Sequence, residues 1–438
     1  TRPMSQLAKD ERDGDLSNHG DSTMYGEIVI LGYNGSIQHT DRGRRHKSKY
    51  TLCKRPSPNG IRKSRHYTVD QPQATRAIQD KELHSISYTI SRSKAIIVEY
   101  QRDSETDMFQ IGRSSESPID FVVTDTAHHP NHPQHSQSSH SSSSKHQFTN
   151  APPAQSTISR FACRILVDRK PPYTARIYAA GFDSSRNIFL GEKATKWEQN
   201  EEIDGLTTNG RQSSSGVWRE VSVNGGIYAI RESRSAAQKG TPVENESNIL
   251  QDGTLIDLCG ATLLWRSADG LKSSPTKKML DDMVDTLNAS RPQCPVGLNT
   301  LVIPRKPSSA DYRDHSSHHR DHGHQPYVYL KCGHVQGLHD WGVTKQSNQR
   351  TCPICLSAGN VVRLTMGLEP SFYVDCGPPT HVFNPCGHMA NEKTVKYWCN
   401  IMIPHGTHFF HSICPFCAVP VSTSEPCYTK LIFQDFVD

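Results

Sequence analysis

The sequence has no run of about 18 or more apolar residues, and this absence excludes a membrane-spanning helix. The first 24 residues also lack the apolar stretch of a secretory signal peptide, so we expect a cytoplasmic chain with reduced thiols. Net charge is small as well: 49 Lys and Arg against 44 Asp and Glu give +5. Bulk electrostatic attraction therefore does not indicate nucleic acid as a partner.

Cysteine is scarce before residue 331, where four of the 13 lie, whereas the other nine lie between Cys332 and Cys427. A secreted disulfide scaffold is short and rich in cysteine throughout, so this distribution excludes that class. The clustering, together with 23 His, directs attention to metal binding in the last quarter of the chain.

Short runs of β-branched and aromatic residues dominate the region 25–267. The expected strands are 26–33, 86–90, 94–100, 119–124, 161–167, 175–181, 227–231 and 255–265. Many short strands without a helical pattern between them predict a β-sandwich, and its length predicts insertions. We expect 1–24 to be a disordered tail.

Two histidine-rich tracts contain almost no apolar residues. The first, 127–150, has six His and seven Ser, and the second, 311–324, has five His. Neither tract can form a core. We interpret both as disordered low-complexity segments rather than metal stores.

One helix is expected in the connector 268–310. Ser274 and Pro275 supply an N-cap and a first-turn proline. Apolar residues follow at helical spacing: Met279, Leu280, Met283, Val284 and Leu287. This stripe predicts a helix that packs against the rest of the molecule.

Four Cys and His pairs follow in a repeated order. They are Cys332 with His334, Cys352 with Cys355, Cys386 with His388, and Cys414 with Cys417. Eight ligands supply two tetrahedral Zn²⁺ sites of three thiolates and one imidazole, with no position left for a catalytic water. The zinc is therefore expected to be structural. Adjacent and interleaved pairings both satisfy the count, and we interpret Cys294, Cys376, Cys399 and Cys427 as non-ligands.

Three polar segments in the predicted sandwich favour phosphate binding. They contain Arg113, then Ser159 and Arg160, then a Thr208-Asn209-Gly210 turn. Each segment alone is a common turn sequence, but guanidinium, hydroxyl and amide donors at one end of a sandwich would hold a phosphate. The stretch 42–65, with ten Lys and Arg and no acid, is interpreted as a solvated loop face. Steering of anionic partners and a nuclear signal are its alternatives.

These motifs resemble known families. Cys386-Gly-His388 followed by Cys414-Pro-Phe-Cys417 resembles the closing site of a RING domain, although residues 389–393 lack the cysteines that a standard RING places there. The order Gly-Arg113, Ser159-Arg160 and Asn209-Gly resembles a forkhead-associated (FHA) domain, with Ala162 in place of the usual histidine. The duplicated zinc motif resembles the Pellino family specifically, and so do the segments 366–370, 384–389, 182–187 and 252–260.

The resemblance implies a mainly β protein, with an FHA-like sandwich over 25–267 and a small α+β RING-like domain over 325–438 that binds two zinc ions. It implies a ubiquitin ligase that binds phosphorylated kinases of Toll and interleukin-1-receptor signalling and promotes their polyubiquitination. Such a ligase forms no covalent intermediate, so no catalytic residue is expected. Phosphothreonine would bind Arg113, Ser159, Arg160, Thr208 and Asn209.

The ubiquitin-conjugating enzyme would contact Ile354, Pro415 and Phe416, unless these side chains pack around the zinc instead. A phospho-dependent adaptor without ligase activity stays open. A zinc-dependent nucleic-acid binder is disfavoured, because basic and aromatic residues do not interleave around the cysteines. A zinc hydrolase is disfavoured because no His-Glu-x-x-His motif is present. We expect no membrane partner.

Overall fold

The computed structural model describes residues 23–33, 49–71, 77–123, 156–199, 202–212, 216–233, 236–304, 324–343, 349–405, 409–423 and 426–434. Almost all of the expected tail, the whole 127–150 insertion and nearly all of the 311–324 tract lie outside these residues. The same holds for residues 42–48 of the basic stretch. Within the described part, no helix is long and apolar enough to cross a membrane.

The first half of the chain is a β-sandwich, as predicted. Its larger layer is an antiparallel sheet in the order β14-β13-β12-β15-β16-β1-β2, with β11 paired to β12. The bounds are β1 Met24–Tyr33, β2 Lys49–Cys53, β11 Lys196–Gln199, β12 Glu202–Gln212, β13 Trp218–Ser222, β14 Ile227–Ala229, β15 Leu255–Asp257 and β16 Ala261–Ser267.

Two four-stranded sheets complete this half. The sheet β7-β6-β8-β9 comprises β6 Thr106–Gly112, β7 Phe121–Val122, β8 Cys163–Asp168 and β9 Ala175–Ala179. The sheet β10-β4-β5-β3 comprises β3 Gly60–Asp70, β4 His84–Ser91, β5 Lys94–Asp103 and β10 Asn187–Leu190. One core, which includes Ile28, Ile165 and Leu263, joins β1 and β16 to the first of these sheets. A second core, around Tyr88 and Phe182, lies under the other.

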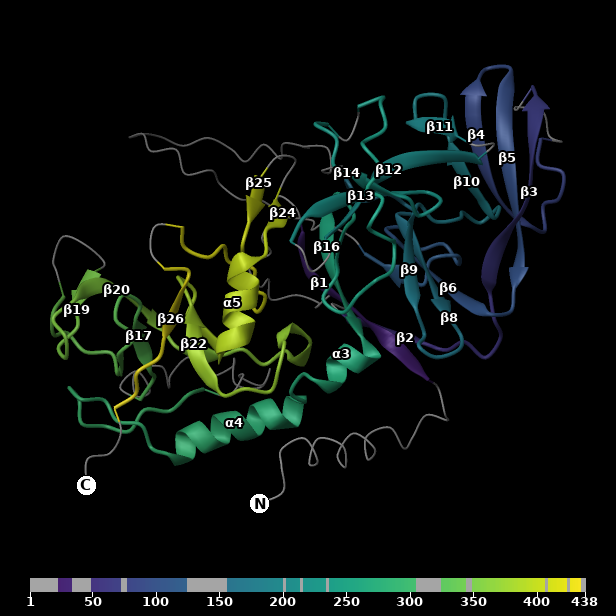
Figure 1. Ribbon diagram of the computed structural model, residues 1–438. Coiled ribbons are helices and arrows are strands. Elements are labelled where there is room, and N and C mark those ends of the chain that lie inside the picture. The colour runs from purple at the N-terminus through teal and green to yellow at the C-terminus, as the bar shows by residue number, and fades with distance from the viewer. Residues whose placement is uncertain are drawn as a thin grey trace, which may run out of the picture.

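Strand β1 is buried on both faces. Successive side chains of a strand point to opposite sides. Ile28 therefore enters the sandwich core, whereas its neighbour Val29 and Leu31 enter a core shared with the C-terminal half. Tyr25 also enters the sandwich core, because the register of β1 shifts between Met24 and Gly26. Figure 1 shows β1 and β16 between the sandwich and the C-terminal half of the chain.

Several strand predictions differ in detail. The expected strand 255–265 is two strands, β15 and β16, joined by a turn in which Cys259 has φ 70°. The expected strand 119–124 is reduced to the two residues of β7. The basic stretch is not a loop face throughout, because β2 and the start of β3 lie within it. Charged residues of β3 are exposed, so the stretch lacks the alternation that identifies a half-buried strand.

The connector contains α3 (Ala268–Lys272) and the predicted helix, α4 (Lys277–Ala289). Leu280 and Val284 of α4 are fully buried, which confirms the packed stripe. The predicted cap was wrong: the side chain of Thr276 accepts the Met279 N–H at 3.1 Å. Ser274 instead lies buried, and its hydroxyl donates to the Tyr373 carbonyl at 2.7 Å.

The C-terminal half consists of two small sheets, a hairpin and α5 (Glu392–Asn400). The sheet β18-β17-β20-β19 comprises β17 Tyr327–Tyr329, β18 Val335–Gln336, β19 Gln349–Thr351 and β20 Ala358–Arg363. The sheet β21-β23-β22-β26 comprises β21 Thr365–Met366, β22 Pro379–Phe383, β23 His388–Asn391 and β26 Tyr428–Lys430. A 3₁₀ turn (Pro370–Phe372) and the hairpin of β24 (Ile403–His405) and β25 (Phe409–His411) complete it.

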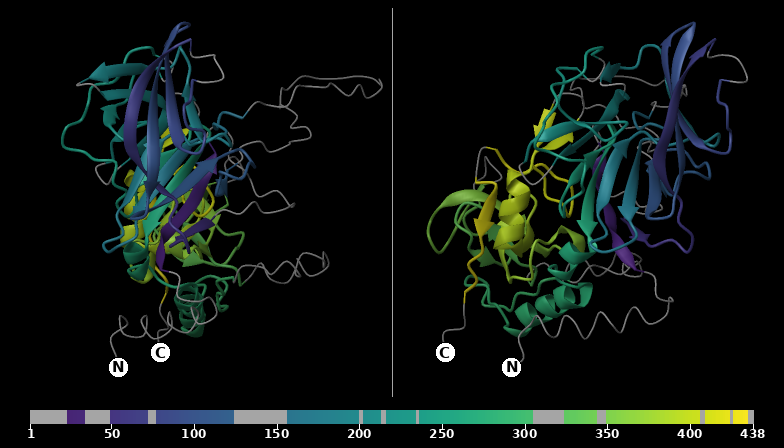
Figure 2. Two further views of the ribbon diagram at one scale, coloured as in Figure 1. Left: turned by 90° about the vertical axis from the view of Figure 1, so that its right-hand side faces the viewer. Right: turned by 45° about the vertical axis from the view of Figure 1, so that its right-hand side comes forward.

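The two halves share a packed junction, and α4 runs beneath the C-terminal half (Figures 1 and 2). The indole N–H of Trp218 donates to the Met402 carbonyl at 2.8 Å. The buried Arg266 guanidinium donates to the carbonyls of Ser371 and Tyr373. Buried polar contacts of this kind fix orientation, because breaking one leaves an unsatisfied group.

Candidate functional site

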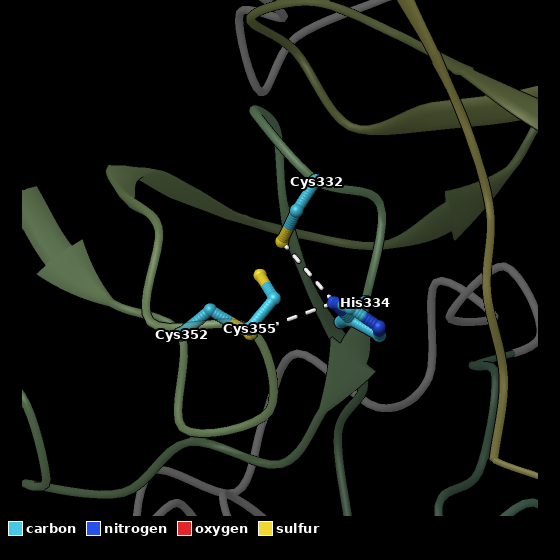
Figure 3. A group of neighbouring side chains, drawn as sticks. All are labelled: Cys332, His334, Cys352 and Cys355. Atoms are coloured by element: carbon cyan, nitrogen blue, oxygen red, sulfur yellow. Dashed lines mark hydrogen bonds between the residues drawn. The ribbon is translucent and has the colours of Figure 1, made fainter.

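The first Cys and His cluster forms between β17 and β20. Cys332 and His334 flank the turn into β18, and Cys352 and Cys355 lie in the turn between β19 and β20. One ligand atom from each residue lies within 4.8 Å of all the others. The side chains point toward one another, with His334 Nδ1 3.3 Å from Cys332 Sγ and 3.6 Å from Cys352 Sγ (Figure 3).

The second cluster repeats this arrangement with Cys386, His388, Cys414 and Cys417, again within 4.8 Å. The structure therefore brings adjacent pairs together and does not interleave them. His388 Nδ1 is buried, and no group among the described residues forms a hydrogen bond with it. A ring nitrogen of His388 lies within 4.8 Å of three sulfurs, which is the arrangement that a metal ligand requires.

The donor sets fit zinc. A tetrahedral ion with Zn–S bonds of about 2.3 Å separates its sulfurs by about 3.8 Å, which these clusters can provide. Burial raises the pKa of Cys332 to about 12, whereas hydrogen bonds with Ser357 lower that of Cys355 to about 6. Thiols this close cannot all ionise without a balancing cation. All four positions of each site are filled by protein, so a metal there is structural.

The two Cys-Pro-x-Cys turns have one backbone conformation. The residue after the second cysteine has positive φ, 61° at Leu356 and 59° at Ala418. Its N–H donates to the carbonyl of the first cysteine at 2.8 Å in both turns. This fold directs both sulfurs of a turn to one side, where they reach a single ion.

A third turn of the same kind lies at Cys294. Leu298 has φ 52°, and its N–H donates to the Cys294 carbonyl at 2.9 Å. Gly297 occupies the position of the second cysteine, and its N–H lies 3.2 Å from Cys294 Sγ. Among the described residues, Cys294 belongs to no metal-ligating group. The shared Cys-Pro-x order at 294–296, 352–354 and 414–416 was the signal that sequence reasoning missed.

The two clusters belong to two copies of one folding unit, residues 326–364 and 379–431. Val328 pairs with Val335 in the first unit as Val382 pairs with Met389 in the second. The chain directly after each unit pairs with the other unit: the N–H of Thr365 donates to the Gly387 carbonyl, and that of Ile432 donates to the Gly333 carbonyl.

Gly333 and Gly387 occupy equivalent positions in these units. They have φ values of 84° and 83°, which only glycine adopts readily. A Cβ at Gly333 would collide with the Lys430 carbonyl of the second unit. A Cβ at Gly387 would collide with the Arg363 carbonyl of the first. The contact between the units is thus approximately twofold symmetric.

The units differ in what covers their Cys-Pro-x-Cys turns. In the first, Ile354 and Leu356 are 45% and 70% exposed. In the second, Pro415 is buried and the Phe416 ring packs against Phe372 and Tyr373, with centroids 5.6 and 5.7 Å away. Of the three residues predicted to contact a conjugating enzyme, Ile354 is exposed, Phe416 is half-buried and Pro415 is buried.

The predicted phosphate site lies at one end of β6 and β8. The Arg113 N–H donates to the Ser159 carbonyl at 3.1 Å, and Arg113 Nε donates to the Ile158 carbonyl at 2.8 Å. Both Arg113 and Arg160 are exposed. The structure therefore brings Arg113, Ser159 and Arg160 together.

Thr208 and Asn209 are not in a turn. They lie within β12, where the pairing to β13 is interrupted between Leu206 and Gly210. The register advances four residues on β12 but only two on β13, so 207–209 form a bulge. The side chains of Thr208 and Asn209 are outside the described part, and their role in phosphate binding stays a prediction.

Comparison with known proteins covers both halves. A family model described as Pellino, FHA domain matches residues 17–283, and one described as Pellino, RING domain matches 287–438. Protein pellino of Drosophila melanogaster is 58% identical over 444 residues, which cover 99% of this chain and 97% of that protein.

Two mammalian relatives are similar along most of their length. The human E3 ubiquitin-protein ligase pellino homolog 2 is 53% identical over 94% of this chain and 96% of its own. The mouse E3 ubiquitin-protein ligase pellino homolog 3 is 49% identical over 94% and 90%. With both family models matched and both Cys and His clusters in place, this chain belongs to the Pellino family of E3 ubiquitin-protein ligases.

Proposed function

We propose that this chain binds phosphorylated kinases of Toll and interleukin-1-receptor signalling through its sandwich and promotes their polyubiquitination through its C-terminal half. The observation that carries the proposal is the pair of closed Cys₃His clusters beside an exposed apolar surface, in a chain with an arginine-lined end on its sandwich. We place this activity in the cytoplasm, where free thiols persist.

Zinc would be held by the eight cluster residues and would supply folding energy rather than chemistry. The chain's own contribution to transfer is positioning. A conjugating enzyme bound beside a docked substrate holds its ubiquitin thioester near a substrate lysine, which raises the effective concentration of the two reactants. No covalent bond to this chain is needed.

We assign the conjugating-enzyme contact to the first unit. Its exposed apolar side chains are Leu338, Trp341, Val343, Ile354 and Leu356. The segment with Trp341 and Val343 lies beside the start of the Cys-Pro-x-Cys turn, because the Thr351 N–H donates to the Gly342 carbonyl at 3.0 Å and Val343 pairs with Arg350. A patch of large apolar side chains with a tryptophan is typical of a protein-binding surface.

The sandwich would bind phosphothreonine through Arg113, Ser159 and Arg160, with Thr208 and Asn209 on the neighbouring strand. Guanidinium groups form short charge-assisted hydrogen bonds with phosphate oxygens. Among the described residues, no carboxylate forms an ion pair with Arg113, so its terminal nitrogens are available to a ligand.

A reconstituted ubiquitination reaction tests the ligase. Wild type should form polyubiquitin chains, and Cys414→Ala/Cys417→Ala should abolish them. Ile354→Ala should reduce chain formation by about tenfold or more, because the change removes a central apolar contact. Ile90→Ala is the matched control, since Ile90 is 42% exposed on the sandwich and should have no effect.

The adaptor alternative makes a different prediction. If folded, zinc-loaded wild type forms no chains with any of several conjugating enzymes, the C-terminal half is a binding surface only. Arg113→Ala tests docking separately: it should weaken phosphothreonine-peptide binding with zinc content unchanged. Equal affinity of the two proteins for the peptide would contradict the docking site.

A further inference from the structure

A carboxylate already occupies part of the proposed phosphate site. Glu116 lies in the loop between β6 and β7, three residues after Arg113. One of its oxygens, Oε1, forms an ion pair with the Arg160 guanidinium and accepts from the Ser114 hydroxyl at 3.2 Å. The other, Oε2, accepts from the Ser184 hydroxyl at 2.6 Å.

These contacts join three loops at one end of the sandwich. Ser114 and Glu116 follow β6, Arg160 precedes β8, and Ser184 precedes β10. The loops are also held by their backbones, since the Ser114 N–H donates to the Arg160 carbonyl at 3.1 Å. Guanidinium and hydroxyl donors thus converge on one anion, and that anion belongs to the chain itself.

The two arginines of the site are therefore not equivalent. Arg160 is paired with Glu116, whereas Arg113 has no carboxylate partner among the described residues. The hydrogen bonds from Ser184 and Arg160 hold the pKa of Glu116 below its usual value, so the carboxylate is charged at neutral pH. An incoming anion therefore has to compete with Glu116 for Nη2 of Arg160.

We infer that Glu116 is an internal competitor that makes the site select phosphate over carboxylate. This inference rests on the proposed phosphothreonine docking. A phosphate carries about −1.5 to −2 charges and three acceptor oxygens, so it can engage Arg113 and also displace Glu116 from Arg160. A peptide glutamate carries one charge and would only exchange one carboxylate for another, at the cost of ordering the peptide. Acidic but unphosphorylated segments are thereby rejected.

The test uses the full chain and three peptide pools that differ only in a fixed central residue, which is phosphothreonine, glutamate or threonine. We would measure the captured fraction of each pool for wild type, Glu116→Gln and Glu116→Asp. The glutamine variant removes the charge, and the aspartate variant keeps it but shortens its reach to Arg160. Glu105→Gln is the matched control, because Glu105 pairs with Lys170 at the opposite end of β6.

We expect the glutamate pool to bind both Glu116 variants about fivefold to tenfold better than wild type, the size expected when one charge-assisted contact is released. The preference for phosphothreonine over glutamate should fall accordingly, and Glu105→Gln should behave as wild type. If wild type prefers phosphothreonine and neither variant changes that preference, the inference is wrong while the docking site stands. If neither wild type nor the variants bind the phosphothreonine pool, the docking proposal itself fails.

Discussion

The two units of the C-terminal half have the same ligands and the same backbone at the metal turn, yet they present different surfaces. The first leaves Ile354 and Leu356 exposed, whereas the second packs Phe416 beneath Phe372, Tyr373 and Phe383. The second unit also lies against the sandwich, where Ala418 is 3.9 Å from the position of a Cβ on Gly32. The two copies of this Cys and His fold thus differ in role: one packs against the sandwich, and the other leaves its metal turn exposed.

Substitution of a metal ligand should have the largest effect on stability, and its effect on the rest of the protein should differ between the two units. Cys352→Ser and Cys414→Ser should each lower zinc content from two ions to one and destabilise the C-terminal half by more than about 4 kcal/mol. Only Cys414→Ser should also increase amide hydrogen exchange at Val29 and Leu31 of β1, because Ala418 of the second unit lies against β1 at Gly32. Equal exchange in the two variants would contradict this division of roles.

Phe416→Ala should mainly lower stability, whereas Ile354→Ala should mainly lower ubiquitin transfer. Phe416→Ala should cost about 3 kcal/mol in the free energy of unfolding, since it empties a packed aromatic cluster. Ile354→Ala should cost less than about 0.5 kcal/mol, because the side chain is exposed, and should lose ubiquitin transfer. Denaturant unfolding and the chain-formation assay measure the two effects. A stable but inactive Phe416→Ala protein would reverse the assignment.

The equivalent glycines test whether the units are symmetric. Gly333→Ala and Gly387→Ala should each destabilise the protein by about 2 kcal/mol, because both combine positive φ with a collision against a carbonyl. Gly216→Ala is the control: its φ is 76°, but an added Cβ would meet nothing within 4 Å. Gly216→Ala should lower the free energy of unfolding by only about 1 kcal/mol. A large effect at only one of the two glycines would show that the contact between the units is unequal.

The smallest effect is expected at the junction with the sandwich. Trp218→Phe removes the indole N–H that donates to the Met402 carbonyl and should cost about 1 kcal/mol. Because Met402 follows α5 in the second unit, hydrogen exchange should rise there and stay unchanged in β17 and β20. An unchanged midpoint of denaturant unfolding would mean that this bond does not hold the halves together.

Much of the fold was predictable from local pattern. Strands such as β4 and β5 are rich in β-branched and aromatic residues, and the apolar stripe of α4 has helical spacing. Strand β3 was missed because its exposed Arg and Lys side chains do not alternate with apolar ones. Its pairing with β5 supplies the hydrogen bonds, and long-range pairing of that kind leaves no signal in the strand's own sequence.

The sequence by itself determined the chemistry of the ligands, because two cysteines separated by Pro and one other residue can reach one ion from a single turn. It also determined that the first half would be a sandwich and that Arg113 and Arg160 would belong to it. Only the tertiary structure decided which pairs share a metal, which metal turn is exposed, and that Glu116 pairs with Arg160. These relations join residues that are tens to hundreds of positions apart, and the packing of whole layers, which no local spacing encodes, sets them.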